Sequence, residues 1–272
     1  MPELPETETI ARDLHAAIGG ARIDAVRVLR ADVVRGVTAA ALSRRLRGRT
    51  VQRAWRRAKS VVLSCDGDVH AVVTPRFTGA LILGTPGVAD DYACIRLEFA
   101  DGRELRYTDV RRLGTFAVFD AASLDAWSRA LGPEPLDPAF TPERLSECLR
   151  GTRRAVKTVL MDQARLAGVG NIYANEALWR AGIRPARRAV TLTRRECAAL
   201  HGALTGVLRA AIALRGTSFR DYRDAFGARG GFAAQLQAYG RGGEPCARCG
   251  EVLQTTHAID GRGTVWCRAC QR

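Results

Sequence analysis

Residues 246–270 read CARCGEVLQTTHAIDGRGTVWCRAC, in which two C-x2-C pairs enclose residues 250–266. Each pair is a tight turn that can direct two thiolates at one ion, and two such pairs supply the ligands of a tetrahedral zinc site. Because four protein ligands leave no open position on the metal, we expect one structural Zn²⁺ ion and not a catalytic one. The expected ligands are Cys246, Cys249, Cys267 and Cys270.

The segment between the two pairs predicts a two-stranded ribbon. Asp260-Gly261 is a hairpin turn signal, and Arg262 follows it near the expected tip, on a fold that metal alone can hold together. Disulfides among these cysteines would need an oxidising compartment, and the sequence shows no secretory segment. The other cysteines are scattered and are expected to be reduced: Cys65, Cys94, Cys148 and Cys197.

The composition favours an acidic polymer as the partner. The chain has 272 residues, 47% of them hydrophobic, and a formal net charge of +14. This length suits two domains with real cores, and the excess of positive charge is typical of nucleic-acid binding. No apolar stretch approaches the length of a membrane span, so we expect a soluble, cytoplasmic protein with no membrane partner.

Lysine is nearly absent from this basic chain. Of 42 Lys plus Arg, only Lys59 and Lys157 are lysines, and Asn171 and Asn175 are the only asparagines. A lysine retained among arginines suggests a task that needs a compact, titratable ammonium. Chance retention is the alternative, and composition alone does not separate the two.

The hydrophobic pattern predicts a β-rich part followed by a helical part. A helix over 5–18 stops at Gly19-Gly20, and strand-like alternation continues to about residue 120, with a hairpin turn at Asp101-Gly102. After a Gly/Pro-rich break, patterns predict helices that start at Pro142, run through Val156 and Met161, follow Asn171, and span 193–214. The fold class is therefore α+β, with a sandwich-like β domain, a helical domain and a metal ribbon.

Two further stretches could support chemistry. If Met1 is removed, Pro2 presents a secondary amine that can attack an aldehyde-like carbon and form an iminium, and the adjacent Glu3 can move protons. The alternative is a helix-start segment with N-terminal acids. Residues 168–171, GVGN, can bind phosphate at a helix N-terminus or serve as an ordinary cap, and their spacing does not match a Walker loop. No nucleotide cofactor is expected.

Together these stretches resemble the formamidopyrimidine-DNA glycosylase family of base-excision repair enzymes, which also contains endonuclease VIII. The resemblance runs essentially end to end. It rests on MPELPE (1–6), RRAK (56–59), YTDVRRLG (107–114), LGPEPL (131–136), AVKTVLMDQ (155–163), GVGNIYANE (168–176), QLQAYGRGGEPC (235–246) and GRGTVWC (261–267).

The resemblance implies an N-terminal β-sandwich with an N-terminal helix, a helix-two-turns-helix DNA-binding domain and a C-terminal zinc finger. We expect these domains at 1–132, 133–235 and 236–272, with a mobile, lesion-capping loop at 216–231. The implied partner is double-stranded DNA that contains oxidised bases or abasic sites. By the same resemblance, the protein is expected to be a monomer of the bacterial cytoplasm, associated with the nucleoid through DNA.

The implied activity is that of a bifunctional glycosylase and abasic-site lyase. Pro2 is implied as the nucleophile at C1′ of the damaged nucleotide, with Glu3 as its acid/base partner. Lys59 is implied near the lesion and in β-elimination, and Arg262 in phosphate contact and δ-elimination. Because a guanidinium hardly deprotonates, an electrostatic role for Arg262 is favoured over proton donation.

The resemblance also implies a set of DNA contacts. Lys157 and Asn171 fall on positions that grip phosphate around the flipped nucleotide, so both lysines of the chain fall on family motifs. Flipping leaves a gap that the family fills with Met, Arg and Phe, whereas the matching residues here are Phe77, Arg111 and Leu113. Any bulky apolar side chain can still unstack a base step. The implied DNA-binding residues are Tyr92, Arg111, Arg153, Lys157 and Asn171.

The chain departs from the family pattern at several positions that bear on substrate preference. Residues 74–76 read Thr-Pro-Arg in place of His-Leu-Gly, Val110 replaces a proline, and Tyr92 replaces a histidine. The loop at 216–231 resembles that of the purine-specific branch, which favours 8-oxoguanine and formamidopyrimidines, although it could also be a simple linker.

Three alternatives remain open at this point. The first is an endonuclease VIII-like glycosylase for oxidised pyrimidines. The second is a non-catalytic zinc-ribbon DNA-binding protein, which would have no use for an exposed prolyl amine. The third is a zinc-ribbon RNA or ribosomal protein, which leaves the long β domain unexplained.

Overall fold

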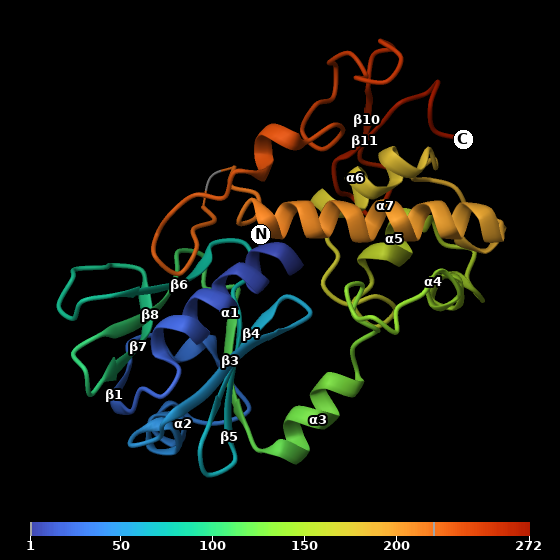
Figure 1. Cartoon of the computed structure of the whole chain (residues 1–272). Coiled ribbons are helices and arrows are strands. Elements are labelled where there is room, and N and C mark those ends of the chain that lie inside the picture. The colour runs from blue at the N-terminus through green and yellow to red at the C-terminus, as the bar shows by residue number, and fades with distance from the viewer. Residues whose placement is uncertain (1, 220) are drawn as a thin grey trace. The chain divides into compact units, whose positions relative to one another are not determined.

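A computed structural model describes residues 2–219 and 221–272 of the chain (Figure 1). The chain forms two compact units, and each is described by itself. The first unit comprises Met1–Ala130 and Leu214–Gly231, and the second comprises Leu131–Ala213 and Phe232–Arg272. The division into 1–132, 133–235 and 236–272 stays a prediction. Within the described residues, no helix combines the length and apolar character needed to cross a membrane.

Two β-sheets and the helix α1 build the first unit. One sheet has the strand order β1-β7-β8-β6, and the other has the order β2-β9-β5-β4-β3. Neighbouring strands are antiparallel except for β2 and β9, which run parallel. The strands are β1 (Ile23–Val28), β2 (Val34–Arg35), β3 (Val51–Arg57), β4 (Ser60–Cys65), β5 (Val69–Thr74), β6 (Gly79–Gly84), β7 (Ala93–Phe99), β8 (Glu104–Asp109) and β9 (Thr115–Phe119).

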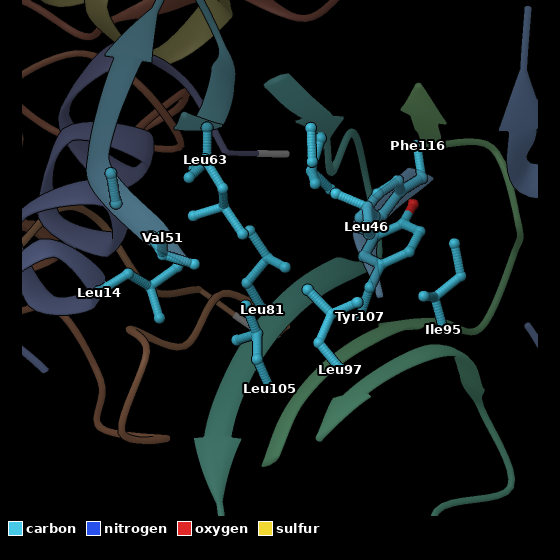
Figure 2. Close-up of a cluster of buried hydrophobic side chains, with 14 of the residues drawn as sticks. Leu14, Leu46, Val51, Leu63, Leu81, Ile95, Leu97, Leu105, Tyr107 and Phe116 are labelled. Carbon is cyan, nitrogen blue, oxygen red and sulfur yellow. The ribbon is translucent and has the colours of Figure 1, made fainter. Parts of the chain in front are cut away.

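The helix α1 (Leu4–Ile18) forms where the sequence predicted it. Pro5 lies in its first turn, where a missing N–H is harmless, and Ile10, Leu14 and Ile18 form the buried stripe that packs against the sheets. Figure 2 shows Leu14 beside Val51 of β3 in the same apolar cluster as strand residues such as Leu81 of β6. The cluster joins α1 to both sheets, so α1 is a fixed part of this unit.

The predicted hairpin at Asp101-Gly102 connects β7 to β8, with Gly102 at a φ of +81°. One helix lies inside the stretch whose pattern predicts strands, and the sequence did not indicate it. This helix, α2 (Ala39–Leu46), begins at the capping hydroxyl of Thr38 and buries only Leu42 and Leu46. Two buried leucines give too short a stripe to stand out from strand alternation. A further helix, α3 (Ala121–Arg129), follows β9.

The second unit is helical with a small β-ribbon, as predicted. Its helices are α4 (Pro142–Leu149), α5 (Val156–Met161), α6 (Asn171–Ala181) and α7 (Arg194–Ala213), and its strands are β10 (Gln254–Thr256) and β11 (Thr264–Trp266). The short 3₁₀ turns of the chain are η1 (Ala31–Val33), η2 (Ala189–Thr191) and η3 (Phe232–Gln235). The antiparallel pair β10–β11 is the ribbon predicted between the two cysteine pairs.

Candidate functional site

The N-terminal segment of the first unit is buried at the start of α1. Pro2 and Glu3 precede the helix, and the Glu3 side chain is 2% exposed. The backbone N–H of Glu3 donates to Oε2 of Glu6 at 2.8 Å, so a carboxylate of the first helical turn fixes the residue next to Pro2. Residue 1 lies outside the described residues, and removal of Met1 therefore stays a prediction.

Lys59 lies in the two-residue turn between β3 and β4, where Ala58 has a φ of +53°. Arg56 holds this turn by donating to the carbonyl oxygen of Ala58 at 3.1 Å, and it also pairs with Glu8 of α1 at 2.9 Å. Burial alone would raise the pKa of Glu8, but the charge and hydrogen bond of Arg56 hold that pKa below its usual value. The helix α1 thus positions both Pro2-Glu3 and the turn with Lys59.

The loop 216–231 is anchored to α1 and to β6. The backbone N–H of Thr217 donates to Oε1 of Glu6 at 2.7 Å, and the N–H of Leu83 donates to the carbonyl oxygen of Ala225 at 2.8 Å. Gly216 has a φ of +84°, and a Cβ there would lie 2.9 Å from Oε1 of Glu6, so glycine is required at this approach. The mobility predicted for the rest of this loop stays a prediction, and residue 220 lies outside the described residues.

The predicted wedge residues lie on two loops of the first unit. Phe77 lies between β5 and β6, whereas Arg111 and Leu113 lie between β8 and β9. Phe77 is 43% exposed and Leu113 is 38% exposed, although both are large apolar side chains. The guanidinium of Arg111 lies over the Phe77 ring at 5.1 Å from its centroid, which is a cation–π contact. The structure therefore brings Phe77 and Arg111 together at an exposed surface, and Leu113 lies on the same loop as Arg111.

Tyr92 is exposed on the segment before β7 and lines a cavity of about 410 Å³. Asp109 and Val110, at the start of the loop that carries Arg111 and Leu113, also line this cavity. Its lining residues are Arg30, Asp91, Tyr92, Cys94, Asp109, Val110 and Arg112.

In the second unit, Lys157 and Asn171 hold the turn that presents Arg262. Lys157 is fully buried, and its ammonium donates to the hydroxyl of Thr264 at 2.6 Å and to the carbonyl oxygen of Gly263 at 3.2 Å. The side-chain amide of Asn171 donates to the same carbonyl at 3.1 Å. Arg262 itself is exposed. The expectation that metal alone holds the ribbon is therefore incomplete, because α5 and α6 also hold it.

Asn175 and Glu176 of α6 also form hydrogen bonds to the C-terminal part of this unit, and the sequence indicated no role for either residue. The side-chain oxygen of Asn175 accepts from the N–H of Val265 at 2.8 Å. The buried carboxylate of Glu176 accepts from the N–H of Ala238 at 2.8 Å and of Tyr239 at 3.0 Å. The four-residue spacing of the only two asparagines was the available signal, since it places both on one helix face. Arg153 is exposed in the segment before α5.

The four cysteines of the second unit form the predicted cluster, with all four Sγ atoms within 4.8 Å of one another. The Sγ atoms of Cys249 and Cys267 are 3.5 Å apart. A tetrahedral zinc with Zn–S bonds of about 2.3 Å sets its sulfurs about 3.8 Å apart, so the spacing suits one ion. Burial opposes the thiolate of Cys246, but the backbone N–H of Arg248 and neighbouring donors lower its pKa to about 6. The cluster could hold a metal ion.

Comparisons with known proteins match both units. The family model described as the formamidopyrimidine-DNA glycosylase N-terminal domain matches residues 1–116, and that of the H2TH domain matches residues 131–223. The chain is similar to formamidopyrimidine-DNA glycosylases of Roseiflexus sp. (strain RS-1) and Xanthomonas campestris pv. campestris (strain B100). Each is 43% identical, and the match covers 100% of both chains.

Two solved structures of Lactococcus lactis Fpg have the same fold. A mutant in complex with DNA that contains Fapy-dG matches with a TM-score of 0.93 and 32% identity, over 100% of each chain. A complex with DNA that contains an abasic site matches with a TM-score of 0.93 and 33% identity, over 99% of each chain. The resemblance read from the sequence is confirmed, and this chain belongs to the formamidopyrimidine-DNA glycosylase family.

Proposed function

We propose that this protein is a bifunctional DNA glycosylase and abasic-site lyase of base-excision repair, which removes oxidised purines from double-stranded DNA. The observation that supports it most directly is the start of α1, where Pro2 and Glu3 are fixed by Glu6 in a chain of this family. A DNA-binding protein without catalysis has no need for a prolyl amine held in this way. Its cytoplasmic location stays a prediction.

In the first step, the lone pair of the Pro2 nitrogen forms a bond to C1′ as the bond between C1′ and the base breaks. The base leaves with the bonding electrons and takes up the proton that the Pro2 nitrogen gives up. The sugar ring then opens, the nitrogen becomes an iminium, and the ring oxygen takes up a proton. We assign the movement of this proton to Glu3, the adjacent carboxylate.

The iminium draws electrons from the sugar, so the proton at C2′ becomes acidic and the 3′ phosphate leaves by β-elimination. We assign Lys59 to this stage, because a lysine amine can take up and release a proton, whereas a guanidinium hardly deprotonates. Arg262 binds phosphate and stabilises the charge of the second, δ-elimination. Asn171 and Lys157 support that phosphate site, with Lys157 acting at least partly through the turn it holds.

The cysteine cluster is proposed to bind one structural Zn²⁺ ion. Cys246, Cys249, Cys267 and Cys270 provide a complete thiolate set, so the ion supplies no open position for chemistry. Its role is to fix the two ends of the ribbon whose central turn presents Arg262.

The substrate class is less constrained than the chemistry. The Lactococcus lactis relatives include complexes with DNA that contains Fapy-dG and one with DNA that contains an oxidised pyrimidine. We favour oxidised purines because the curated relatives are named formamidopyrimidine-DNA glycosylases. The alternative, a preference for oxidised pyrimidines, is not favoured by these relatives.

Borohydride trapping tests nucleophile and substrate together. The protein is incubated with duplexes that contain 8-oxoguanine, thymine glycol or no lesion, and the reduced iminium is measured as a covalent protein–DNA adduct. We expect adducts with both lesions, formed fastest with 8-oxoguanine, and none with intact DNA. Peptide mapping should locate the adduct at Pro2.

The matched control is the same sequence with one residue left ahead of Pro2. That residue converts the prolyl nitrogen into an amide, which has no nucleophilic lone pair, while every side chain is kept. Trapping by this blocked protein would exclude Pro2 as the nucleophile, and faster trapping on thymine glycol would reverse the substrate assignment.

A further inference from the structure

Two loops of the first unit carry the predicted wedge residues, one between β5 and β6 and the other between β8 and β9. Both of these wedge loops form hydrogen bonds to one buried carboxylate. Asp109, the last residue of β8, is 1% exposed. Its Oδ1 accepts a hydrogen bond from the Thr78 hydroxyl at 2.5 Å and another from the backbone N–H of Arg111 at 3.1 Å. Its Oδ2 accepts from the N–H of Gly114 at 2.8 Å and from the Tyr107 hydroxyl at 3.3 Å. Donors from both loops therefore converge on a single side chain.

Close packing restricts the same loops. A Cβ on Gly114 would lie 2.1 Å from the hydroxyl oxygen of Tyr107 and 2.7 Å from the carbonyl oxygen of Pro75, so only glycine fits there. Arg76 and Arg112 have φ values of +51° and +50°, in the left-handed region that L residues rarely adopt. Such backbone strain persists only where the surrounding contacts over-determine the conformation. The loops thus have one strongly specified arrangement.

The two wedge loops are also joined to each other at their exposed surface. The N–H of Arg111 donates to the hydroxyl oxygen of Thr78 at 3.0 Å, so Thr78 links Arg111 to Asp109 while its neighbour Phe77 lies under the Arg111 guanidinium. Phe77 and Arg111 come from different loops, and the cation–π contact and the hydrogen bond through Thr78 join them. The Phe77 ring and the Arg111 guanidinium therefore form a connected pair whose loops both bind Asp109.

We propose that Asp109 is a positioning residue that holds the two loops together, so that Phe77 and Arg111 enter the base stack as one preassembled pair. This inference rests on the proposed function, because it concerns how the nucleotide is extruded. Extrusion needs side chains that fill the gap at once, and side chains that are already ordered lose less freedom when they do so. Asp109 lies beneath the loops and acts only through them.

The test separates extrusion from the later chemistry. Asp109→Asn keeps the shape of the side chain but presents an amide NH₂ to donors that need an acceptor. One substrate is a duplex with 8-oxoguanine opposite cytosine, and the other is a single strand with an abasic site, which has no paired base to extrude. We expect single-turnover cleavage of the duplex to fall about tenfold or more, which is the effect expected from losing one hydrogen bond to the Asp109 carboxylate. Cleavage of the single strand should stay within about twofold of the wild type.

Controls keep the result distinct from failure of the proposed function. Asp125→Asn, on the exposed helix α3 of the same unit, should match the wild type on both substrates. If the wild type cleaves neither substrate, the proposed function fails and the role of Asp109 is not at issue. If the wild type cleaves both, equal losses by Asp109→Asn on the two substrates, or no loss on either, overturn the inference.

Asp109→Asn could also unfold, which a shifted melting temperature would reveal. In that case Thr78→Val decides, because it removes one hydroxyl that bridges the loops and keeps the side-chain shape. We expect Thr78→Val to lower duplex cleavage about threefold, a fraction of the full effect, and to leave single-strand cleavage unchanged. A loss shared by both substrates, or none, contradicts the proposal.

Discussion

The ammonium of Lys157 donates to the hydroxyl of Thr264 at 2.6 Å, and this bond ties a fully buried lysine of α5 to the first residue of β11. Lysine is rarely buried without a structural reason, because its charge must be matched by acceptors. Here those acceptors belong to the turn that presents Arg262. One of the only two lysines in the chain therefore has a structural role inside the protein.

Lys157→Met should loosen that turn. The substitution keeps the length of the side chain but removes the ammonium that donates to the Thr264 hydroxyl and, together with Asn171, to the Gly263 carbonyl. We therefore expect a loss of about 1–3 kcal/mol in the free energy of unfolding. Amide hydrogen exchange across 260–265 should become faster, and strand cleavage should fall. Arg209→Met on α7, which removes an exposed cation, serves as control. Unchanged exchange across 260–265 would show that Lys157 does not hold the turn.

Glu6→Gln should weaken two segments at once. One carboxylate oxygen of Glu6 accepts from Glu3 at 2.8 Å and the other from Thr217 at 2.7 Å, whereas a glutamine offers only one acceptor oxygen. We expect a loss of about 1.5–3 kcal/mol in stability and faster proteolysis within the loop 216–231, together with slower base excision. Glu98→Gln, which affects a partly exposed ion pair with Arg27, should change none of these three readouts. A Glu6→Gln protein with wild-type proteolysis would contradict the anchoring role.

Loss of the metal should disorder the ribbon from its cysteine end. Cys249→Ser removes one of four ligands, and we expect the bound zinc measured by atomic absorption to fall and strand cleavage to fall with it. Exchange should rise first near 246–250 and less near 263–265, which α5 and α6 also hold. Cys148→Ser, outside the cluster, is the control. Full zinc content and full cleavage in Cys249→Ser would exclude this assignment.

Acid should remove the stabilisation from one ion pair of the second unit. The hydrogen bond from Arg187 lowers the pKa of Glu196 to about 2, against an ordinary value of 4.5. A depressed pKa in the folded state means that this stability is present above about pH 4.5 and is lost as the pH falls toward about 2. Because the pair is partly exposed, we expect at most about 1 kcal/mol. Urea unfolding at pH 7 should separate the wild type from Glu196→Gln, and the difference should shrink by pH 3; a constant difference would refute the assignment.

Local patterns made much of this protein predictable. The helix α1, the hairpin at Asp101-Gly102, the later helices and the cysteine cluster all follow from spacing and turn chemistry within short stretches. The helix α2 was missed because it lies within strand-like sequence and buries only two leucines.

Long-range polar contacts were not predictable in the same way. Glu6 accepts a hydrogen bond from Thr217, which lies 211 residues later in the sequence. No periodicity within either segment indicates that these two residues are partners. Asp109 lies within the motif YTDVRRLG (107–114), but the Thr78 hydroxyl that donates to it comes from another loop. Residue types predicted a chemistry for the candidate site, whereas the carboxylates that hold its segments together became visible only in three dimensions.

The first unit is built from two separate stretches of chain, since residues 214–231 complete a body that otherwise ends at Ala130. Tyr222 and Ala225 from the later stretch are buried in its apolar core. During synthesis on the ribosome, the β-sheets therefore emerge long before the residues that close their core, and the helices of the second unit are made in between. A fragment that stops at residue 130 should expose apolar surface and aggregate, so the nascent N-terminal half depends on completion of the chain for its solubility.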